Sequence, residues 1–184
     1  IVDPPYGIET KGNARERFRM GKSLKNITDN KPTEEYFIEL FRISKNQIVW
    51  GYNHLSDMLP KCREFVFWYK HQPVVTFADG ELAWTSFQKT AKCFDYPYYK
   101  ANADNKRNDK KIHPTQKPVK LYEWLLDNYA NEGDKILDTH LGSGSIAIAC
   151  HNRGFDLTGF EIDKEYFDNA CERLRVHQSQ LTMF

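Results

Sequence analysis

The sequence predicts an α/β protein with a doubly wound, mostly parallel sheet in a single domain spanning residues 1–184. Short β-branched and aromatic runs with turn residues on both sides alternate with segments of helical periodicity. A glycine-bearing loop, residues 139–144, connects one such run to a small-residue helix, which is typical of parallel sheets. With 184 residues, 40% of them hydrophobic, the chain can bury one sizeable core.

The first half of the chain predicts one helix and two strands. From Thr33 to Asn46 the apolar residues fall on one helical face, and Pro32 stands just ahead, where a helix tolerates it. Residues 47–51 and 64–69 are apolar runs that predict two strands buried on both faces.

The second half predicts alternating helices and strands. Apolar spacing predicts a helix that opens at Pro118 and runs to Tyr129, followed by a strand over 135–138. Residues 145–153 predict a helix ended by Gly154, and residues 156–161 predict another strand. Asp163 is placed to cap a last helix.

Composition excludes several classes of protein. A formal charge of +1 excludes a globally basic protein, so any contact with nucleic acid must be local. The apolar runs are too short to span a bilayer, and we expect a soluble, cytoplasmic protein without membrane contact. The four cysteines form no CxxC pair, which predicts reduced thiols and no metal site. Because the chain lacks an initiator Met, we expect its natural beginning to be missing.

Two basic segments interrupt the alternation, at residues 8–31 and 100–120. A solvated surface is the ordinary interpretation of such charge runs. Each segment here adjoins a candidate functional motif, which favours contact with phosphates. We predict that 8–31 is a mobile basic loop that closes over a target.

The first motif is a glycine loop, Asp138 to Ser145, which contains Gly142, Ser143 and Gly144. Glycines at the end of a strand let a ligand approach the backbone closely, and Glu161, at the end of the next strand, can accept hydrogen bonds from a ribose. The pattern predicts an adenosine-containing cofactor. The spacing is not GxGxxG, so a nicotinamide dinucleotide ranks lower, and a tight turn without a ligand remains the alternative.

The second motif is Asp3-Pro4-Pro5-Tyr6. Two prolines stiffen the peptide and leave its carbonyl groups free to accept hydrogen bonds, beside a carboxylate and a flat ring. Such a set can hold a planar amine, with Tyr6 stacked on the base that carries it. The alternative interpretation is a proline-rich turn after a strand.

Together with residues 113–118 (HPTQKP), these motifs resemble the signature of S-adenosylmethionine-dependent DNA amino-methyltransferases of the permuted β-group. The resemblance spans nearly the whole chain and implies a Rossmann-like methyltransferase fold with S-adenosyl-L-methionine as cofactor. It implies a catalytic set that holds a flipped DNA base: Asp3, Pro4, Pro5 and Tyr6. It implies a cofactor-binding set: Asp138, Gly142, Ser143, Gly144, Glu161, Lys117 and Pro118.

The resemblance leaves several alternatives open. Asp3 before the prolines favours adenine N6 over cytosine N4 as the target. Methylation of another planar amine, such as an RNA base or a protein glutamine, and a catalytically silent DNA-binding relative are alternatives. Residues 87–112 are a short candidate for target recognition, with aromatic side chains suited either to base stacking or to a local cluster. Restriction-modification, with DNA as partner, and a homodimer are further expectations from the family.

Overall fold

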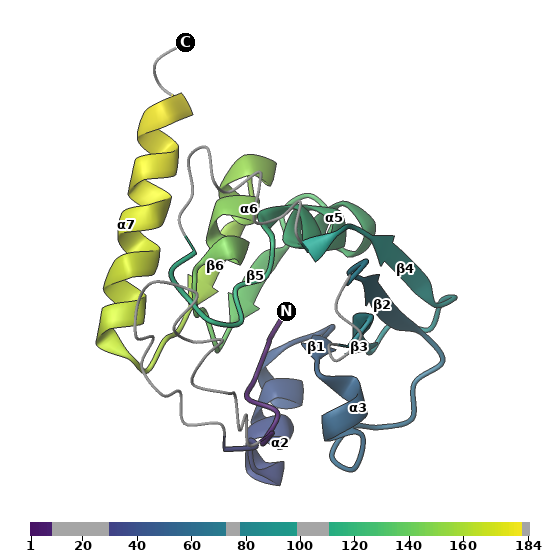
Figure 1. Cartoon of the computed structure of the whole chain (residues 1–184). Coiled ribbons are helices and arrows are strands. Elements are labelled where there is room, and N and C mark those ends of the chain that lie inside the picture. Colours follow the sequence, from purple (N-terminus) through teal and green to yellow (C-terminus); the bar gives the residue numbers. More distant parts are fainter. Residues whose placement is uncertain (9–29, 73–77, 99–110, 182–184) are drawn as a thin grey trace.

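The computed structural model describes residues 1–8, 30–72, 78–98 and 111–181. Its helices are α2 (Glu34–Ile43), α3 (Tyr52–Leu55), α5 (Val119–Tyr129), α6 (Ser145–Arg153) and α7 (Lys164–Leu181) (Figure 1). Its strands are β1 (Ile48–Trp50), β2 (Phe65–Tyr69), β3 (Gly80–Thr85), β4 (Lys92–Asp95), β5 (Lys135–Asp138) and β6 (Asp156–Gly159).

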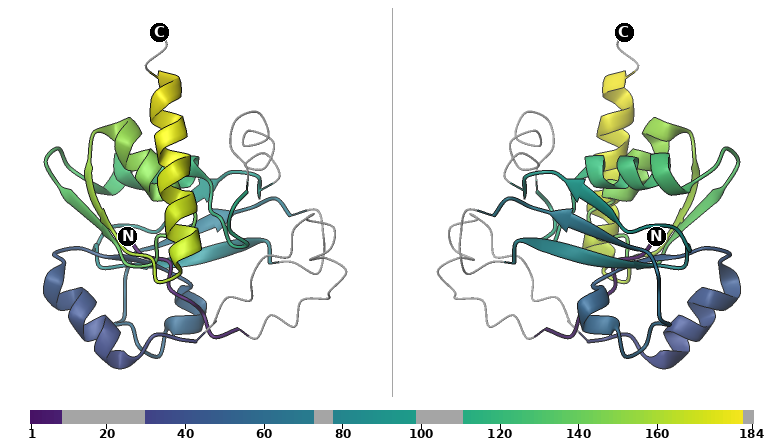
Figure 2. Two further views of the ribbon diagram at one scale, coloured as in Figure 1. Left: turned by 90° about the vertical axis from the view of Figure 1, so that its left-hand side faces the viewer. Right: turned by 90° about the vertical axis from the view of Figure 1, so that its right-hand side faces the viewer.

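The N-terminal residues join two groups of strands into one continuous sheet. One group has the order β1-β3-β2-β4, and the other is the parallel pair β5-β6. Val2 forms a parallel bridge with Val49 of β1, while the Ile1 backbone nitrogen donates to the Leu137 carbonyl of β5 at 2.9 Å. The expectation that the segments ending at Val2 and Asp138 are neighbours is confirmed, and the N-terminus lies between the two groups in both views (Figures 1 and 2).

Helices cover both faces of this sheet, as a doubly wound fold requires. One core cluster packs α5 and α6 against the face that carries Trp50, Val66 and Trp68. A second cluster packs Phe37 and Leu40 of α2, with residues of and after α3, against the opposite face. α7 lies beside α6 and extends past the rest of the fold (Figure 2). The α/β class is therefore confirmed.

Three elements were not predicted from the sequence: α3, β3 and β4. β3 runs antiparallel to both β1 and β2, whereas β2-β4 and β5-β6 are parallel, so the sheet is mostly parallel with one reversed strand. The prediction that residues 64–69 are buried on both faces was wrong. Val66 and Trp68 are buried against helix α5, but Phe65 and Tyr69, on the other face, are 38% and 37% exposed.

The helix boundaries follow the predicted local signals. Asp163 caps α7, because its Oδ1 accepts from the backbone nitrogens of Glu165 at 2.8 Å and Tyr166 at 3.2 Å. Gly154 ends α6 at a φ of +73°, in the left-handed region that glycine adopts without strain. No helix in the described ranges is long and apolar enough to cross a membrane.

The two basic segments lie mostly outside the described residues, so the predicted mobility of 8–31 stays a prediction. The described part of 87–112 forms β4 and a local aromatic cluster. The ring of Phe94 stacks on Tyr96 at 5.6 Å and contacts Trp124 at 5.4 Å, and Trp68 donates its indole hydrogen to the Tyr96 carbonyl. These side chains pack on one another and on Trp124, and target recognition by residues 87–112 stays a prediction.

Candidate active site

The tetrapeptide follows Val2 directly, at the edge of the sheet where the parallel strands end. The Tyr6 hydroxyl donates to Asp3 Oδ1 at 2.6 Å. The Lys117 ammonium group donates to Asp3 Oδ2 and lies 3.4 Å from the Tyr6 hydroxyl oxygen. Each Asp3 oxygen therefore has one donor and keeps a further lone pair for a ligand.

Tyr6 is held by the residues that follow β1. Its ring stacks on His54 of α3, with 5.3 Å between centroids and 15° between planes. The ring lies against Gly51, where a Cβ would stand 2.1 Å from Tyr6 Cε1, so only glycine fits. Burial, together with the nearby Asp3 and Glu81 carboxylates, raises the pKa of Tyr6 well above its usual value. The hydroxyl therefore stays protonated and donates to Asp3.

Lys117 is a buried ammonium group at the centre of this cluster. Its side chain is only 4% exposed and lies over the rings of Tyr6 and Trp50, at 5.9 and 5.3 Å from their centroids. Burial alone would lower the pKa of Lys117. The carboxylates of Asp3 and Glu81 outweigh burial and raise it, so Lys117 remains charged.

Glu81, on β3, completes the cluster. One of its oxygens lies 3.0 Å from the Lys117 nitrogen, and the other forms an ion pair with Lys70, just after β2. Burial would raise the pKa of Glu81, but the two ammonium groups lower it to about 2. No sequence motif marked Glu81 or Lys70 as part of a site.

The glycine loop connects β5 to α6. Gly142 adopts a φ of +51° and donates its backbone hydrogen to Glu161 Oε2 at 2.8 Å, and the backbone nitrogen of Asp163 donates to Glu161 Oε1 at 3.0 Å. Gly144 adopts a φ of +69° against Ala170 of α7, where a Cβ would meet that side chain at 3.0 Å. The two glycines therefore allow the loop to pack between Glu161 and α7.

Asp138 ends β5 underneath this loop. It is 1% exposed and accepts from the His140 backbone nitrogen at 3.0 Å. Burial raises the pKa of Asp138 to about 6, so a cationic group placed beside it would favour the ionised form. The predicted residue Ser143 is buried rather than open: its hydroxyl faces that of Ser145, and its carbonyl accepts from Arg173.

One residue connects the tetrapeptide to the glycine loop. The Lys117 side chain binds Asp3, and the Lys117 carbonyl accepts a hydrogen bond from the Ser145 hydroxyl at 2.7 Å. Pro118 is buried directly after it and precedes α5. The catalytic and cofactor sets predicted from the sequence therefore meet at one edge of the sheet, with the Lys117 ammonium directed at Asp3 rather than at the loop.

Two histidines lie near the glycine loop. His113 packs on Tyr166 at 4.6 Å and would be 3.7 Å from a Cβ at Gly142. His140 contacts Tyr36 of α2, and the Tyr36 hydroxyl lies 2.7 Å from Thr139 Oγ1. Burial lowers the pKa of both histidines. His113 therefore has a packing role here, and no sequence motif marked Tyr36 as part of a site.

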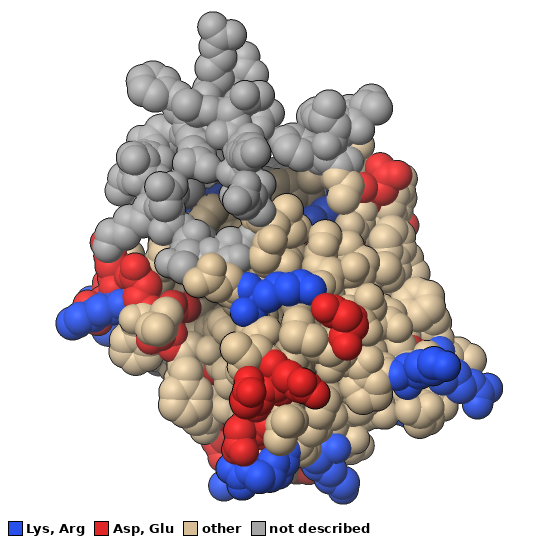
Figure 3. Space-filling model, turned by 90° about the horizontal axis from the view of Figure 1, so that it is seen from below, with Lys and Arg blue, Asp and Glu red and all other residues tan. Residues whose placement is uncertain are grey.

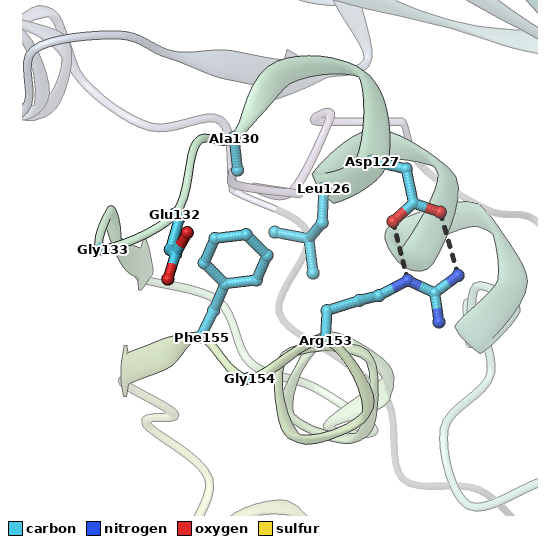
Figure 4. A pocket seen from close by; sticks show the side chains of 8 residues that line it. All are labelled: Leu126, Asp127, Ala130, Glu132, Gly133, Arg153, Gly154 and Phe155. Carbon is cyan, nitrogen blue, oxygen red and sulfur yellow. Dashed lines mark hydrogen bonds and ion pairs between the residues drawn. The ribbon is translucent and has the colours of Figure 1, made fainter.

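Two surface hollows occupy different edges of the sheet. One, of about 280 Å³, is lined by Leu126, Phe155 and the Arg153–Asp127 ion pair (Figure 4). It adjoins the residues that precede β5 and β6, at the edge opposite Asp138 and Glu161. The other, of about 680 Å³, is shallow, includes Ile162 and Asp163 and adjoins Glu161.

The surface below α2 and α3 carries charges of both signs. Lys and Arg side chains are interspersed with Asp and Glu among the described residues of this face (Figure 3). Within the same described part of the chain, no group of three His, Cys, Asp or Glu residues could hold a metal ion.

Comparison with known proteins identifies the class. Residues 42–172 match the N6/N4 methyltransferase family model, which is described as DNA methylase, and the chain belongs to this family. The resemblance inferred from the motifs is thereby confirmed.

Individual relatives match over shorter segments. The type II methyltransferase M.HpaI of Haemophilus parainfluenzae is 44% identical over 66 residues, 36% of this chain and 21% of the relative. M2.DpnII of Streptococcus pneumoniae, also a type II methyltransferase, is 40% identical over 64 residues, 35% of this chain and 24% of the relative. The match thus spans less than a quarter of the length of either relative.

Solved structures share the fold. The M1.HpyAVI complex with S-adenosylmethionine matches with a TM-score of 0.61 and 20% identity, over 94% of this chain and 86% of that one. The cytosine-N4-specific PvuII DNA methyltransferase matches with a TM-score of 0.57 and 14% identity, over 99% and 84%. These likenesses confirm the Rossmann-like methyltransferase fold.

The close approach of Tyr6 to Gly51 predicts an unequal cost for two glycine substitutions. Gly51 and Gly133 both have left-handed φ angles, +80° and +85°, but a Cβ at Gly133 meets nothing within 4 Å. Gly133→Ala should cost about 1–2 kcal/mol of unfolding free energy, from backbone strain alone. Gly51→Ala should cost about 2–5 kcal/mol, because it adds a collision with Tyr6. Urea unfolding measures both, and equal losses would contradict this packing.

The raised pKa of Asp138 predicts a pH dependence of stability. Between about pH 4 and pH 6 the folded protein keeps a proton on Asp138 that the unfolded chain releases. Stability should therefore fall as the pH rises through this window, by about 2–3 kcal/mol. Asp138→Asn should remove this fall, whereas Asp156→Asn, an exposed carboxyl on β6, should retain it. Denaturant unfolding from pH 3.5 to 7 measures the difference, and parallel curves for the wild type and Asp138→Asn would refute it.

Proposed function

We propose that this chain transfers the methyl group of S-adenosylmethionine to the exocyclic amino group of a flipped-out DNA base, with adenine N6 preferred over cytosine N4. The observation that carries the proposal is the bridge made by Lys117, which binds Asp3 through its side chain and Ser145 through its carbonyl. A group held at the glycine loop and an amine held at Asp3 would then be neighbours, as methyl transfer requires.

The residues at the loop fit the cofactor. Glu161 keeps acceptor capacity for the two ribose hydroxyls beyond its two backbone hydrogen bonds. The apolar side chains on either side of it, Phe160 and Ile162, are 57% and 102% exposed beside the shallow hollow, and a flat adenine would cover such a surface. Asp138 offers a carboxylate to the amino group of the methionine portion. When bound, the cofactor supplies an electrophilic methyl group on a sulfonium.

The tetrapeptide fits the other reactant. The nitrogen of an exocyclic amine is a poor nucleophile, because its lone pair is delocalised into the base. Hydrogen bonds from its two N–H groups to Asp3 and to the Pro4 carbonyl would favour a pyramidal nitrogen with a directed lone pair. Tyr6 contributes by holding Asp3 through its hydroxyl, and its ring is already stacked on His54. Alignment therefore supplies most of the rate. The amine becomes acidic only once it is methylated and then releases its proton to solvent, so neither histidine is needed as a base.

The experiment that tests this function is direct. The chain is incubated with labelled S-adenosylmethionine and with either duplex or single-stranded DNA from a host that lacks DNA methylases, and the nucleosides are analysed. N6-methyl-2′-deoxyadenosine supports the preferred target and N4-methyl-2′-deoxycytidine the alternative. Absence of both contradicts the function and favours a catalytically silent relative. A restriction-modification role and homodimer formation stay predictions, the latter checked by sedimentation.

Removal of the Glu161 carboxylate should weaken cofactor binding. Glu161→Ala removes the proposed ribose acceptor and the partner of Gly142, so affinity for S-adenosylmethionine should fall by about 5- to 150-fold, from a loss of about 1–3 kcal/mol. Glu132→Ala, in the hollow at the opposite edge, is the matched control and should bind normally. Isothermal calorimetry measures both, and unchanged affinity in Glu161→Ala would remove this residue from the site.

Removal of the Asp3 carboxylate should separate binding from chemistry. Asp3→Ala should abolish methyl transfer and leave affinity for S-adenosylmethionine within a few-fold, because Asp3 acts on the target amine. Asp127→Ala, a surface carboxyl on α5, serves as the control. Steady-state methylation and calorimetry report the two quantities. An Asp3→Ala enzyme that still transferred methyl groups at the wild-type rate would refute the role of the tetrapeptide.

A further inference from the structure

Glu81 is a charged, largely buried residue that the proposed reaction does not use. It belongs to neither motif, and its side chain is 25% exposed. Both of its oxygens face ammonium groups, one from Lys117 at 3.0 Å and the other from Lys70. Buried ion pairs of this kind generally contribute little to stability, because desolvation offsets their attraction. A role in organising the site is the better explanation for its position.

The direction of β3 brings Glu81 to the site. Because β3 is antiparallel, its first residues lie where the parallel strands end, and Glu81 pairs with Trp68 near the end of β2. Ala83, two residues later on the same side of β3, belongs to the core cluster under α5, so Glu81 faces the layer that Lys117 enters. Lys70 follows Trp68 by two residues and lies over its ring at 4.9 Å.

The charges alternate along this cluster. In order they are Lys70, Glu81, Lys117 and Asp3, two cations and two anions, and the Tyr6 hydroxyl ends the row at Asp3. The Lys117 ammonium donates a hydrogen bond to Asp3 and forms an ion pair with Glu81, and the Tyr6 oxygen lies nearby. Without the Glu81 charge, Asp3 would be the only anion paired with Lys117 among the described residues, and Lys70 and Lys117 would repel each other.

We propose that Glu81 is a positioning residue: by sharing the Lys117 ammonium, it keeps the Asp3 carboxylate available to accept a hydrogen bond from the target amino group. The inference rests on the proposed methyl transfer and extends it to a residue outside the motifs. Lys117 attracts the Asp3 carboxylate, and Glu81 weakens that attraction, so that a free lone pair of Asp3 can be directed at the target amine. Glu81 itself touches neither reactant.

Three variants test the inference: Glu81→Gln, Lys117→Met and the double variant. The assay uses DNA from a methylase-deficient host and labelled S-adenosylmethionine. Glu81→Gln should lower kcat/KM for DNA by about 10- to 100-fold, which is the scale of a misplaced reacting group. Its affinity for S-adenosylmethionine should stay within about twofold of the wild type, because the glycine loop is untouched.

In the Lys117→Met variant, Glu81→Gln should raise the activity instead of lowering it. There the Asp3 and Glu81 carboxylates face each other without the ammonium between them, and repulsion moves the acid limb of the pH–rate profile to higher pH. Tyr122, His113 and Lys70 also face this cluster and are unchanged in every variant. Adding Glu81→Gln should move the limb back and make the double variant more active than Lys117→Met alone.

Controls make the outcome decisive. Glu81→Asp keeps the charge and should retain more activity than Glu81→Gln. Glu123→Gln, a buried carboxyl on α5 bound to Lys120 and Asn152, should leave the rate and the acid limb unchanged. The double variant loses one charge of each sign. It can therefore be compared with Lys117→Met even where Glu81→Gln alone is unstable.

The possible results separate the two proposals. A wild-type chain that methylates no DNA overturns the proposed function, and this inference with it. An active wild type whose Glu81→Gln variant matches it overturns the inference alone. A further loss of activity when Glu81→Gln is added to Lys117→Met does the same, because a merely structural residue would lower the activity of both backgrounds.

Discussion

The buried ammonium group of Lys117 holds the two halves of the candidate site together. Its side chain binds Asp3, 114 residues away in the sequence, and its carbonyl accepts from Ser145, 28 residues away. Burial opposes a charge at this position, and the carboxylates of Asp3 and Glu81 overcome that opposition. Because the contacts come from both the side chain and the backbone of one residue, a shift of Lys117 would move both the tetrapeptide and the glycine loop.

The reversed strand β3 has a consequence for the chemistry. In a wholly parallel sheet, only residues at the carboxyl ends of strands reach the ligand edge. An antiparallel strand presents its first residues there instead, so Glu81 and the end of β2 meet beside Lys117. The sheet thereby supplies a second carboxylate to the lysine without lengthening either motif.

Packing at the tetrapeptide is as restrictive as its electrostatics. Tyr6 lies between His54 and the backbone of Gly51, and its hydroxyl is directed at Asp3. Gly51 lies between β1 and α3, and its left-handed φ leaves room for the ring. The orientation of the Asp3 carboxylate therefore depends on a glycine that follows a neighbouring strand. The family match, over residues 42–172, does not include Asp3.

The sequence by itself determined the α/β class and the helices at α2, α5, α6 and α7, and it marked both motifs from which the function is proposed. Those features rest on local signals: apolar periodicity, the Asp163 cap, the glycines around Ser143 and the stiffness of two prolines. β2 was misjudged, because apolar residues on a strand do not reveal whether a helix covers its second face.

Only the tertiary structure decided how these parts combine. The Lys117–Asp3 contact, the approach of Glu81 and the stacking of Tyr6 on His54 join segments that are distant in sequence. The direction of β3 is set by its pairing with β1 and β2, and nothing in residues 80–85 encodes an orientation. Side-chain partners across a sheet edge follow from strand order and direction, which are long-range properties of the folded chain.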